Sequence, residues 1–329
     1  MLRILHDTNY DFIRWWKVMA AITIAFILLG LGSLAIKPPN YSIEFTGGTL
    51  MQLEFTKPPD VGVIRSTLDQ AGIHGAEIQQ FGTNREFTVR AQDPSTVAAQ
   101  SKGAESIAVT IEKVLKTKFG ENNLKVVRRE AVGPRVGSEL RRGAIIAILL
   151  SFLITLVYLS IRFEWRFATA AVIATSHDVF TTIAFLKLMH LEISLTVVAG
   201  LLTVLGYSLN DTIIIFDRVR ENLRKGRKET LYVTLNRSIN ETLPRSVLTH
   251  VTVLAATLSL LIFAGEVIRP FAWVMAFGII TGTFSSIYVA APVLLWIERK
   301  WPRKTGARQS SSTATPTSRT QRSPATATR

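Results

Sequence analysis

The sequence predicts a polytopic α-helical membrane protein with six transmembrane helices and one sizeable α+β domain outside the bilayer. Apolar residues gather into six stretches, each near the ~17 to 25 residues that a spanning helix needs. One long polar segment, residues 37–141, separates the first stretch from the other five. A soluble chain of 329 residues would build two or three domains with their own cores, and here the bilayer replaces those cores.

The six apolar stretches are expected to be membrane spans, and the first is expected to remain as an uncleaved anchor. Its apolar run of about 19 residues is longer than the ~7 to 15 of a signal peptide, although residues 33–35 resemble a cleavage site. The predicted spans are residues 18–36, 143–161, 167–186, 193–216, 246–264 and 271–297.

Positive charge is concentrated beside these spans. The chain has 38 lysines and arginines against 24 aspartates and glutamates, a net charge of +14 that would suggest nucleic acid in a soluble protein. Here the basic segments alternate with neutral loops, as the positive-inside rule requires. We therefore expect both termini in the cytoplasm, residues 37–141 on the opposite side, and no nucleic-acid partner. The basic segments are 14–17, 162–166, 218–228 and 299–304.

The polar segment 37–141 is expected to fold as a ferredoxin-like domain. Residues 49–55 alternate like a strand, residues 60–71 have helical apolar spacing, and residues 76–81 and 86–91 indicate a hairpin. A second amphipathic helix ends near Gly120, and a strand follows at 124–129. The order β-α-β-β-α-β is that of a ferredoxin-like module.

The predicted division of the chain is 1–36 for the N-terminus and first span, 37–141 for the α+β domain, 142–298 for the five remaining spans, and 299–329 for a disordered cytoplasmic tail. The tail is rich in Ser, Thr, Pro, Ala and Arg and has almost no large apolar residues. Within the third part, residues 217–245 are predicted to form a basic cytoplasmic loop. This loop is either a connector attracted to anionic lipid or a helix that docks a partner.

Several kinds of chemistry are excluded by residue type. Cysteine is absent, so there are no disulfides and no thiolate ligands. The sequence has no P-loop, no metal-ligand cluster and no Ser-His-Asp spacing. We therefore expect no cofactor, no metal and no enzymatic activity, so that any work must draw on an ion gradient or on the ATPase of a partner.

Asp211 is the strongest candidate for a functional group, because a carboxylate inside a span is costly and usually marks function. It lies ~18 residues into its span, or ~27 Å along the axis, in the cytoplasmic half of the membrane. Arg245 begins the next span from the same side, so the two are expected to meet and to bind and release a proton as helices move. Tyr207 and Arg218 lie on the same helix face as Asp211.

Asp178, beside His177, lies close to the midplane and is a second candidate proton site. The alternative is that His177, Asp178 and Asn210 hydrogen-bond across helices and only fix packing. His250, one turn into its span, either relays protons or is a packing residue. A stripe of small residues that begins at Gly278 and Gly282 is expected to permit close helix packing.

The chain resembles the SecF branch of the SecD/SecF family of protein-export membrane proteins, and the resemblance extends over nearly the whole chain up to the tail. The motifs that carry it are FTGG at 45–48, GPRVG at 133–137, FEWR at 163–166, HDV at 177–179, GYSLND at 206–211, FDRVREN at 216–222 and TLPRS at 242–246. Among the residues of these motifs are Gly47, Gly48, Gly206, Asp217 and Arg218.

The resemblance implies an RND-superfamily half-transporter in the bacterial inner membrane, with its α+β domain in the periplasm. It implies a SecD-like subunit and a SecYEG-type channel as partners, exported unfolded proteins as substrates, and the proton motive force as the energy source for late export. In that family the residues that match Asp211 and Arg245 form the proton path of this subunit. Glu44 and His250 depart from the family pattern, which usually has Asp and a small residue there.

Two other function classes remain open at this point. One is an intramembrane aspartyl protease with Asp178 and Asp211 as its paired carboxylates, but the Gly-Xaa-Gly-Asp pattern of that family is absent and a dyad needs carboxylates ~3 Å apart. An exporter of lipids or small molecules on the same scaffold would need a second half and a substrate pocket of its own.

Overall fold

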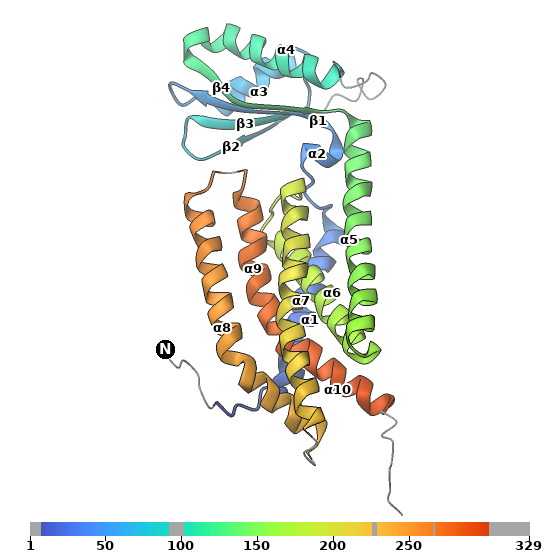
Figure 1. Cartoon of the computed structure of the whole chain (residues 1–329). Helices are drawn as coiled ribbons and strands as arrows, with labels where there is room; N and C mark the ends of the chain where they lie inside the picture. The colour runs from blue at the N-terminus through green and yellow to red at the C-terminus, as the bar shows by residue number, and fades with distance from the viewer. Residues whose placement is uncertain (1–7, 92–101, 226–228, 266, 303–329) are drawn as a thin grey trace, which may run out of the picture.

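The computed structural model describes residues 8–91, 102–225, 229–265 and 267–302. It has two parts, a bundle of long helices and an α+β domain stacked on one end of it (Figure 1). We call this end of the bundle the domain end and the opposite end the basic end. The predicted disordered tail lies outside the described residues, apart from 299–302.

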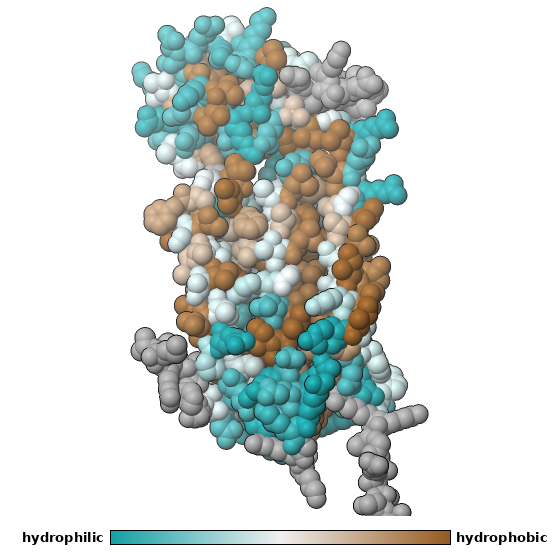
Figure 2. Space-filling model, viewed as in Figure 1, coloured by the Kyte–Doolittle hydropathy of each residue, from teal (hydrophilic) through white to brown (hydrophobic). Residues whose placement is uncertain are grey.

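Six helices of the described part are long and apolar enough to span a membrane, as predicted. Three of them, α6, α7 and the pair α9 and α10, form the centre of the bundle, while α1, α5 and α8 are mostly exposed. Figure 2 shows hydrophobic residues over the bundle between two more hydrophilic ends. The bounds are α1 (Trp16–Ile36), α5 (Pro134–Arg162), α6 (Trp165–Leu188), α7 (Leu195–Arg224), α8 (Leu231–Phe263), α9 (Arg269–Ser285) and α10 (Ala291–Lys300).

The predicted basic loop 217–245 is wrong as a loop. Helix α7 continues to Arg224 and α8 already begins at Leu231, so only a short connection lies between them. Both helices extend beyond the apolar core because their charged residues pair with one another: Arg218 contacts Glu241 at 2.5 Å across the two helices. Ion pairs between neighbouring helices stabilise polar helical turns that hydropathy alone assigns to a loop.

The α+β domain has the predicted ferredoxin-like topology. Its sheet has the strand order β2-β3-β1-β4 with every neighbouring pair antiparallel. Helices α3 and α4 cover the face that points away from the bundle (Figure 1). The apolar core between them includes Met51, Ile64 and Ile111. The elements are β1 (Gly48–Phe55), α3 (Val61–Gln70), β2 (Glu77–Gln80), β3 (Glu86–Ala91), α4 (Lys102–Phe119) and β4 (Leu124–Val132).

The paired glycines form the junction between the domain and the bundle. They follow the short helix α2 (Ile43–Thr46) and have φ angles of 75° at Gly47 and 125° at Gly48, which favour glycine. A Cβ on Gly47 would come within 2.7 Å of the Pro134 backbone at the start of α5. The motif therefore lets the entry to β1 pack directly against the first turn of α5.

Glu44 ties the same junction to α7. Its Oε2 accepts a hydrogen bond of 2.6 Å from the backbone N–H of Leu195, in the first turn of that helix, where a negative charge is favourable. On the other side of the junction, Arg90 of the sheet pairs with Glu192 in the loop before α7. The glutamate that departs from the family pattern therefore caps a membrane helix.

The N-terminal segment is held to the basic end of α8 by two asparagines. Asn240 bonds to both backbone groups of Tyr10, accepting from its N–H and donating to its carbonyl, each at 2.9 Å. Asn236, one turn earlier, accepts from the N–H of Ile13 at 3.1 Å. Two asparagines four residues apart on one helix face therefore hold backbone groups that are three residues apart in the N-terminal segment.

Asn240→Ala is expected to raise the amide exchange rate of Tyr10 about tenfold, because both backbone bonds of that residue are lost. Hydrogen–deuterium exchange measures this rate, and an unchanged rate would show that the asparagine does not hold the segment.

The Tyr232 hydroxyl, which donates to Asp11 at 2.6 Å, holds the pKa of that carboxyl below its ordinary value of 3.8. The hydrogen bond from Tyr232 to the charged Asp11 is therefore at full strength at neutral pH, and it weakens only as the pH falls through that lowered pKa.

Candidate functional site: two buried carboxylates in the bundle

Small residues on α9 bring the central helices close enough to form the site. A Cβ on Gly278 would overlap Val204 of α7, and one on Gly282 would lie 3.0 Å from the Cβ of Ser208. The predicted packing role of these two glycines is confirmed. Because α9 lies so close to α7, short serine side chains reach from one helix to the other.

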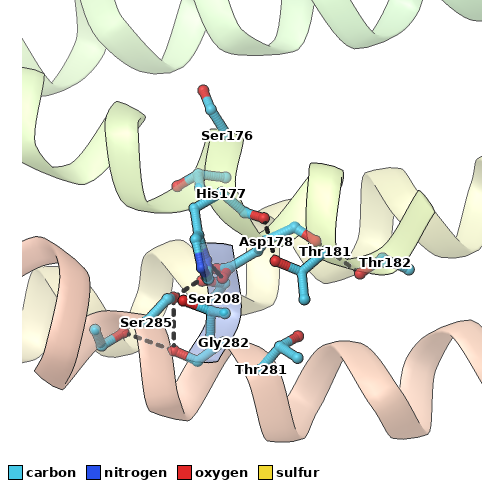
Figure 3. A network of polar contacts seen from close by, with 12 residues as sticks. Ser176, His177, Asp178, Thr181, Thr182, Ser208, Thr281, Gly282 and Ser285 are labelled. Carbon is cyan, nitrogen blue, oxygen red and sulfur yellow. Dashed lines mark hydrogen bonds and ion pairs between the residues drawn. The ribbon is translucent and has the colours of Figure 1, made fainter. Parts of the chain in front are cut away.

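Asp178 lies fully buried on α6 and is surrounded by hydrogen-bond donors from three helices (Figure 3). Its Oδ2 accepts from Ser208 of α7 at 2.5 Å and from Ser285 of α9 at 2.7 Å. Its Oδ1 lies 3.2 Å from Nδ1 of His177 on its own helix. Both carboxylate oxygens therefore have partners, and Asp178 joins the three central helices.

Asp211 lies on α7 and is 3% exposed, but it has fewer partners than Asp178. Its Oδ1 accepts from Ser246 of α8 at 2.5 Å, whereas its Oδ2 is buried and accepts no hydrogen bond from the described residues. Ser286 is close enough to interact with this carboxylate, yet its hydroxyl bonds to Thr212 and to the carbonyl of Gly282. One oxygen of Asp211 is thus available to a proton.

His250 and Tyr207 border the Asp211 site. His250 is buried, and its Nδ1 lies 2.5 Å from the carbonyl of Ser246, the residue that bonds to Asp211. The rings of Tyr207 and His250 meet edge to face with centroids 5.3 Å apart. The hydroxyl of Tyr207 is buried without a hydrogen-bond partner among the described residues. A second titratable group therefore stands one helical turn from Ser246.

A turn of π-helix connects the two sites. Residues Ser286–Ala290 form this turn between α9 and α10, directly after Ser285, and Pro292 follows near the start of α10. Ser285 bonds to Asp178, and Ser286 bonds at 2.8 Å to Thr212, the neighbour of Asp211. Single π-helical turns inside α-helices are frequent at functional sites. Here the turn places adjacent serines beside the two different carboxylate sites.

The expected contact between Asp211 and Arg245 is absent from this structure. Arg245 is exposed, and no ion pair involves it among the described residues. Its neighbour Ser246 faces inward to Asp211 instead. Consecutive residues on a helix point about 100° apart, so only one of the two faces α7. In this structure Arg245 therefore points away from Asp211, although its neighbour Ser246 contacts that carboxylate.

The expected bond of Asn210 across helices is also absent, because this residue is exposed and makes no side-chain hydrogen bond within the described part. Apart from its chain neighbours and the backbone of its own helix, Gly206 has no described atom within 4 Å of its Cβ position, and Asp217 is exposed on the same side of α7. The side chain of Arg218, the next residue along α7, points to another side of the helix, where it pairs with Glu221 and Glu241.

Sequence reasoning missed the hydroxyl residues that complete the two sites. Ser208, Ser246, Ser285 and Ser286 are buried, and the first three donate directly to Asp178 or Asp211. Serine and threonine are common in membrane helices, where they bond to the preceding turn of their own backbone. The available signal was proximity in sequence: Ser208 lies three residues before Asp211, and Ser246 follows Arg245.

A helical bundle with two buried carboxylates at its centre and an α+β domain at one end defines an integral membrane protein whose buried ionisable residues mark a candidate functional site. The family model described as "Protein export membrane protein SecD/SecF, C-terminal" matches residues 110–300, and the model described as "SecD/SecF GG Motif" matches residues 32–59. The chain belongs to the SecD/SecF family of protein-export membrane proteins.

Similar proteins agree with this assignment. Protein translocase subunit SecF of Gemmatimonas aurantiaca is 63% identical over 92% of this chain and 91% of its own length. The subunit of the same name in Vibrio alginolyticus is 41% identical over 88% of this chain and 90% of its own length. Crystallised SecDF of Thermus thermophilus, a translocon-associated membrane protein, superposes with a TM-score of 0.79 at 34% identity over 91% of this chain. The chain spans 40% of that longer SecDF chain.

Proposed function

We propose that this protein is the SecF-type subunit of a protein-export complex and that it couples proton movement at Asp211 to the late export of unfolded proteins. The observation that carries the proposal is the unpartnered, buried Oδ2 of Asp211. A charged carboxylate at such a position costs about 3 kcal/mol or more, so it exchanges between a protonated and a compensated charged form. Loss of gradient-dependent export on substitution of Asp211 is the test of this coupling.

Arg245 is proposed as the group that compensates the charge in another state of the cycle. It lies next to Ser246 on α8 and lines a cavity of about 660 Å³ at the basic end, together with Asp217 and Arg218. A rotation of α8 by about 100° would exchange Arg245 for Ser246 at the Asp211 carboxylate, because the two residues are adjacent on one helix. The cavity would give water a route to that carboxylate.

Asp178 is proposed as a second proton site that responds to the first. Three polar groups already contact its carboxylate, which supports a partly structural role for Asp178. Its connection to the Asp211 site through Ser208 and the π-helical turn supports a second role, in which its protonation responds to that of Asp211. His177, His250, Tyr207 and the neighbouring hydroxyls are proposed as supporting polar groups, and no catalytic role is assigned to any of them.

A SecD-like membrane partner is proposed to cover α7 and α8. Lipid favours large apolar residues, and exposed residues of that kind occur on α5. The exposed residues of α7 recur at helical spacing but are small or polar, and α8 carries a similar stripe. We call these two stripes the polar face. Its residues are Ala199, Thr203, Gly206, Asn210 and Asp217 on α7, and Arg245, Thr249, Thr252, Ala256 and Ser259 on α8.

The orientation follows from charge. The basic end carries arginines such as Arg162, Arg220 and Arg299, and by the positive-inside rule it is proposed to face the cytoplasm of a bacterial inner membrane. Both described chain ends leave the bundle at this end (Figure 1). The α+β domain is then periplasmic, where exported chains emerge from a SecYEG-type channel. No enzymatic reaction is proposed, since Asp178 and Asp211 bond to different serines and form no dyad.

Gly206→Leu is expected to reduce co-purification of a co-expressed SecD-like subunit at least tenfold, because a large side chain in the polar face would separate the helices that meet there. Gly143→Leu is the matched control, since Gly143 is also an exposed helical glycine with no neighbour within 4 Å and lies on α5. Affinity purification from membranes measures both. Equal recovery of the partner with the two variants would remove the polar face as its binding site.

A further inference from the structure

An apolar pocket of about 240 Å³ opens at the domain end of the bundle, and neither Asp178 nor Asp211 lines it. It lies between the end of α1, the first turns of α5 and the end of α6. Its walls are almost entirely hydrocarbon and include Leu34, Ile145, Ile148, Ile183 and Leu201. In water such a pocket would be unfavourable, but at this level of the bundle the surroundings are lipid.

The positive charge of this pocket lies at one end of it, nearest the α+β domain. Arg141, Ile145 and Ile148 lie on one face of α5, because they are spaced four and three residues apart. The arginine is nearest the domain end, and Ile148 lies ~10 Å deeper along the axis. The pocket is thus cationic at the level of the lipid headgroups and apolar below it.

A second cation stands at the same level on α6. The ammonium of Lys187 donates to the carbonyls of Lys37 and Pro38, each at 2.9 Å, which holds it at the rim with one N–H still free. His190, exposed just beyond the end of α6, also lines the pocket. No aspartate or glutamate is among the lining residues. The rim therefore suits an anion with several acceptor oxygens.

We propose that this pocket binds one anionic phospholipid, with its phosphate between Arg141 and Lys187 and one acyl chain along Ile145 and Ile148. Phosphate oxygens accept strong hydrogen bonds from arginine and lysine, and each buried methylene of the acyl chain adds to the affinity. A helix of a partner protein is ~10 Å across and does not fit a pocket of this size. The lipid belongs to the leaflet next to the α+β domain.

The bound lipid also touches the segment that joins α1 to the domain. Tyr41 and Phe45, which lie just before the paired glycines, line the same pocket. An acyl chain packed against these rings stabilises the junction on its lipid-facing side, where the protein itself leaves a cavity. The site is independent of proton coupling, and only its assignment to the periplasmic leaflet rests on the proposed orientation.

Native mass spectrometry of the full-length protein, purified with its co-expressed partner, tests the site with added phosphatidylglycerol or phosphatidylcholine of the same acyl chains. We expect one phosphatidylglycerol to be retained at least fivefold more than phosphatidylcholine. Arg141→Gln is expected to reduce that retention at least fivefold. Arg142→Gln is the matched control, because Arg142 is the exposed neighbour on the same helix and does not line the pocket.

A second pair of variants tests the apolar part. Ala144→Trp fills the pocket and is expected to abolish retention, whereas Ile146→Trp, on the exposed face of α5, is expected to preserve it. Equal retention of the two lipids, or equal losses within either matched pair, would overturn the proposal. Since the chain has no cysteine, Ile145→Cys also gives a unique cross-linking position, and a cross-link to a protein in place of lipid there would overturn it as well.

Discussion

Asp211→Asn is expected to abolish the part of protein export that depends on the proton gradient while the complex stays assembled. Asparagine has the shape of aspartate, and its carbonyl oxygen still accepts the hydrogen bond of 2.5 Å from Ser246. It cannot bind or release a proton near neutral pH, so only the coupling is removed. Export into inverted membrane vesicles, with and without a gradient and at matched subunit abundance, measures the effect. The stimulation should fall to that of vesicles lacking the subunit.

Asp69→Asn is the control for this experiment. Asp69 lies on α3 of the α+β domain with its side chain 45% exposed, outside the cavity and the polar face, so its neutralisation leaves the buried site intact. We expect it to retain gradient-dependent export. Undiminished stimulation in Asp211→Asn would remove Asp211 as the proton carrier and transfer that role to Asp178 or to the partner subunit.

Gly30→Leu is expected to cost about 3 kcal/mol or more of stability and to reduce accumulation of the folded protein. Gly30 is the buried contact of α1, whose surface is otherwise mostly exposed, and a Cβ there would overlap both the Cβ and the backbone of Ala184 on α6. A leucine would force the two helices apart. Thermal unfolding in detergent and the amount of folded protein in membranes measure this effect.

Gly32→Leu, two residues further along the same helix, separates packing from helix propensity. Gly32 has nothing within 4 Å of its Cβ position, so leucine would point into lipid and improve the helix. We expect an unchanged or slightly raised melting temperature. If both leucines destabilised the protein equally, close approach of α1 and α6 at Gly30 would not be the reason.

Much of the fold could be predicted from the sequence because hydrophobic patterning acts over local segments. The six spans and the order of the ferredoxin-like elements follow from runs of apolar residues and from periods of two or 3.6 residues. The ends of α7 and α8 could not be predicted in this way. They depend on the contact of Arg218 with Glu241, which joins residues that are distant in sequence.

The identity and depth of the candidate groups were determined by the sequence alone. Asp178 and Asp211 lie within apolar runs, and a carboxylate there has to be buried among protein groups, as both are. The same reasoning placed Arg245 near Asp211 along the helix axis, and its neighbour Ser246 bonds to that carboxylate.

The direction of each side chain was decided only by the tertiary structure. A spanning helix is apolar on every face, so its sequence carries little sign of which face meets the bundle and which meets lipid or a partner. Packing of α9 on α7 turns Ser208 and Ser285 toward Asp178, while Ser246 rather than Arg245 faces Asp211. Asn210 is left on the polar face for the same reason. Neighbouring helices, not local composition, set these directions, because they determine which side of each helix is filled.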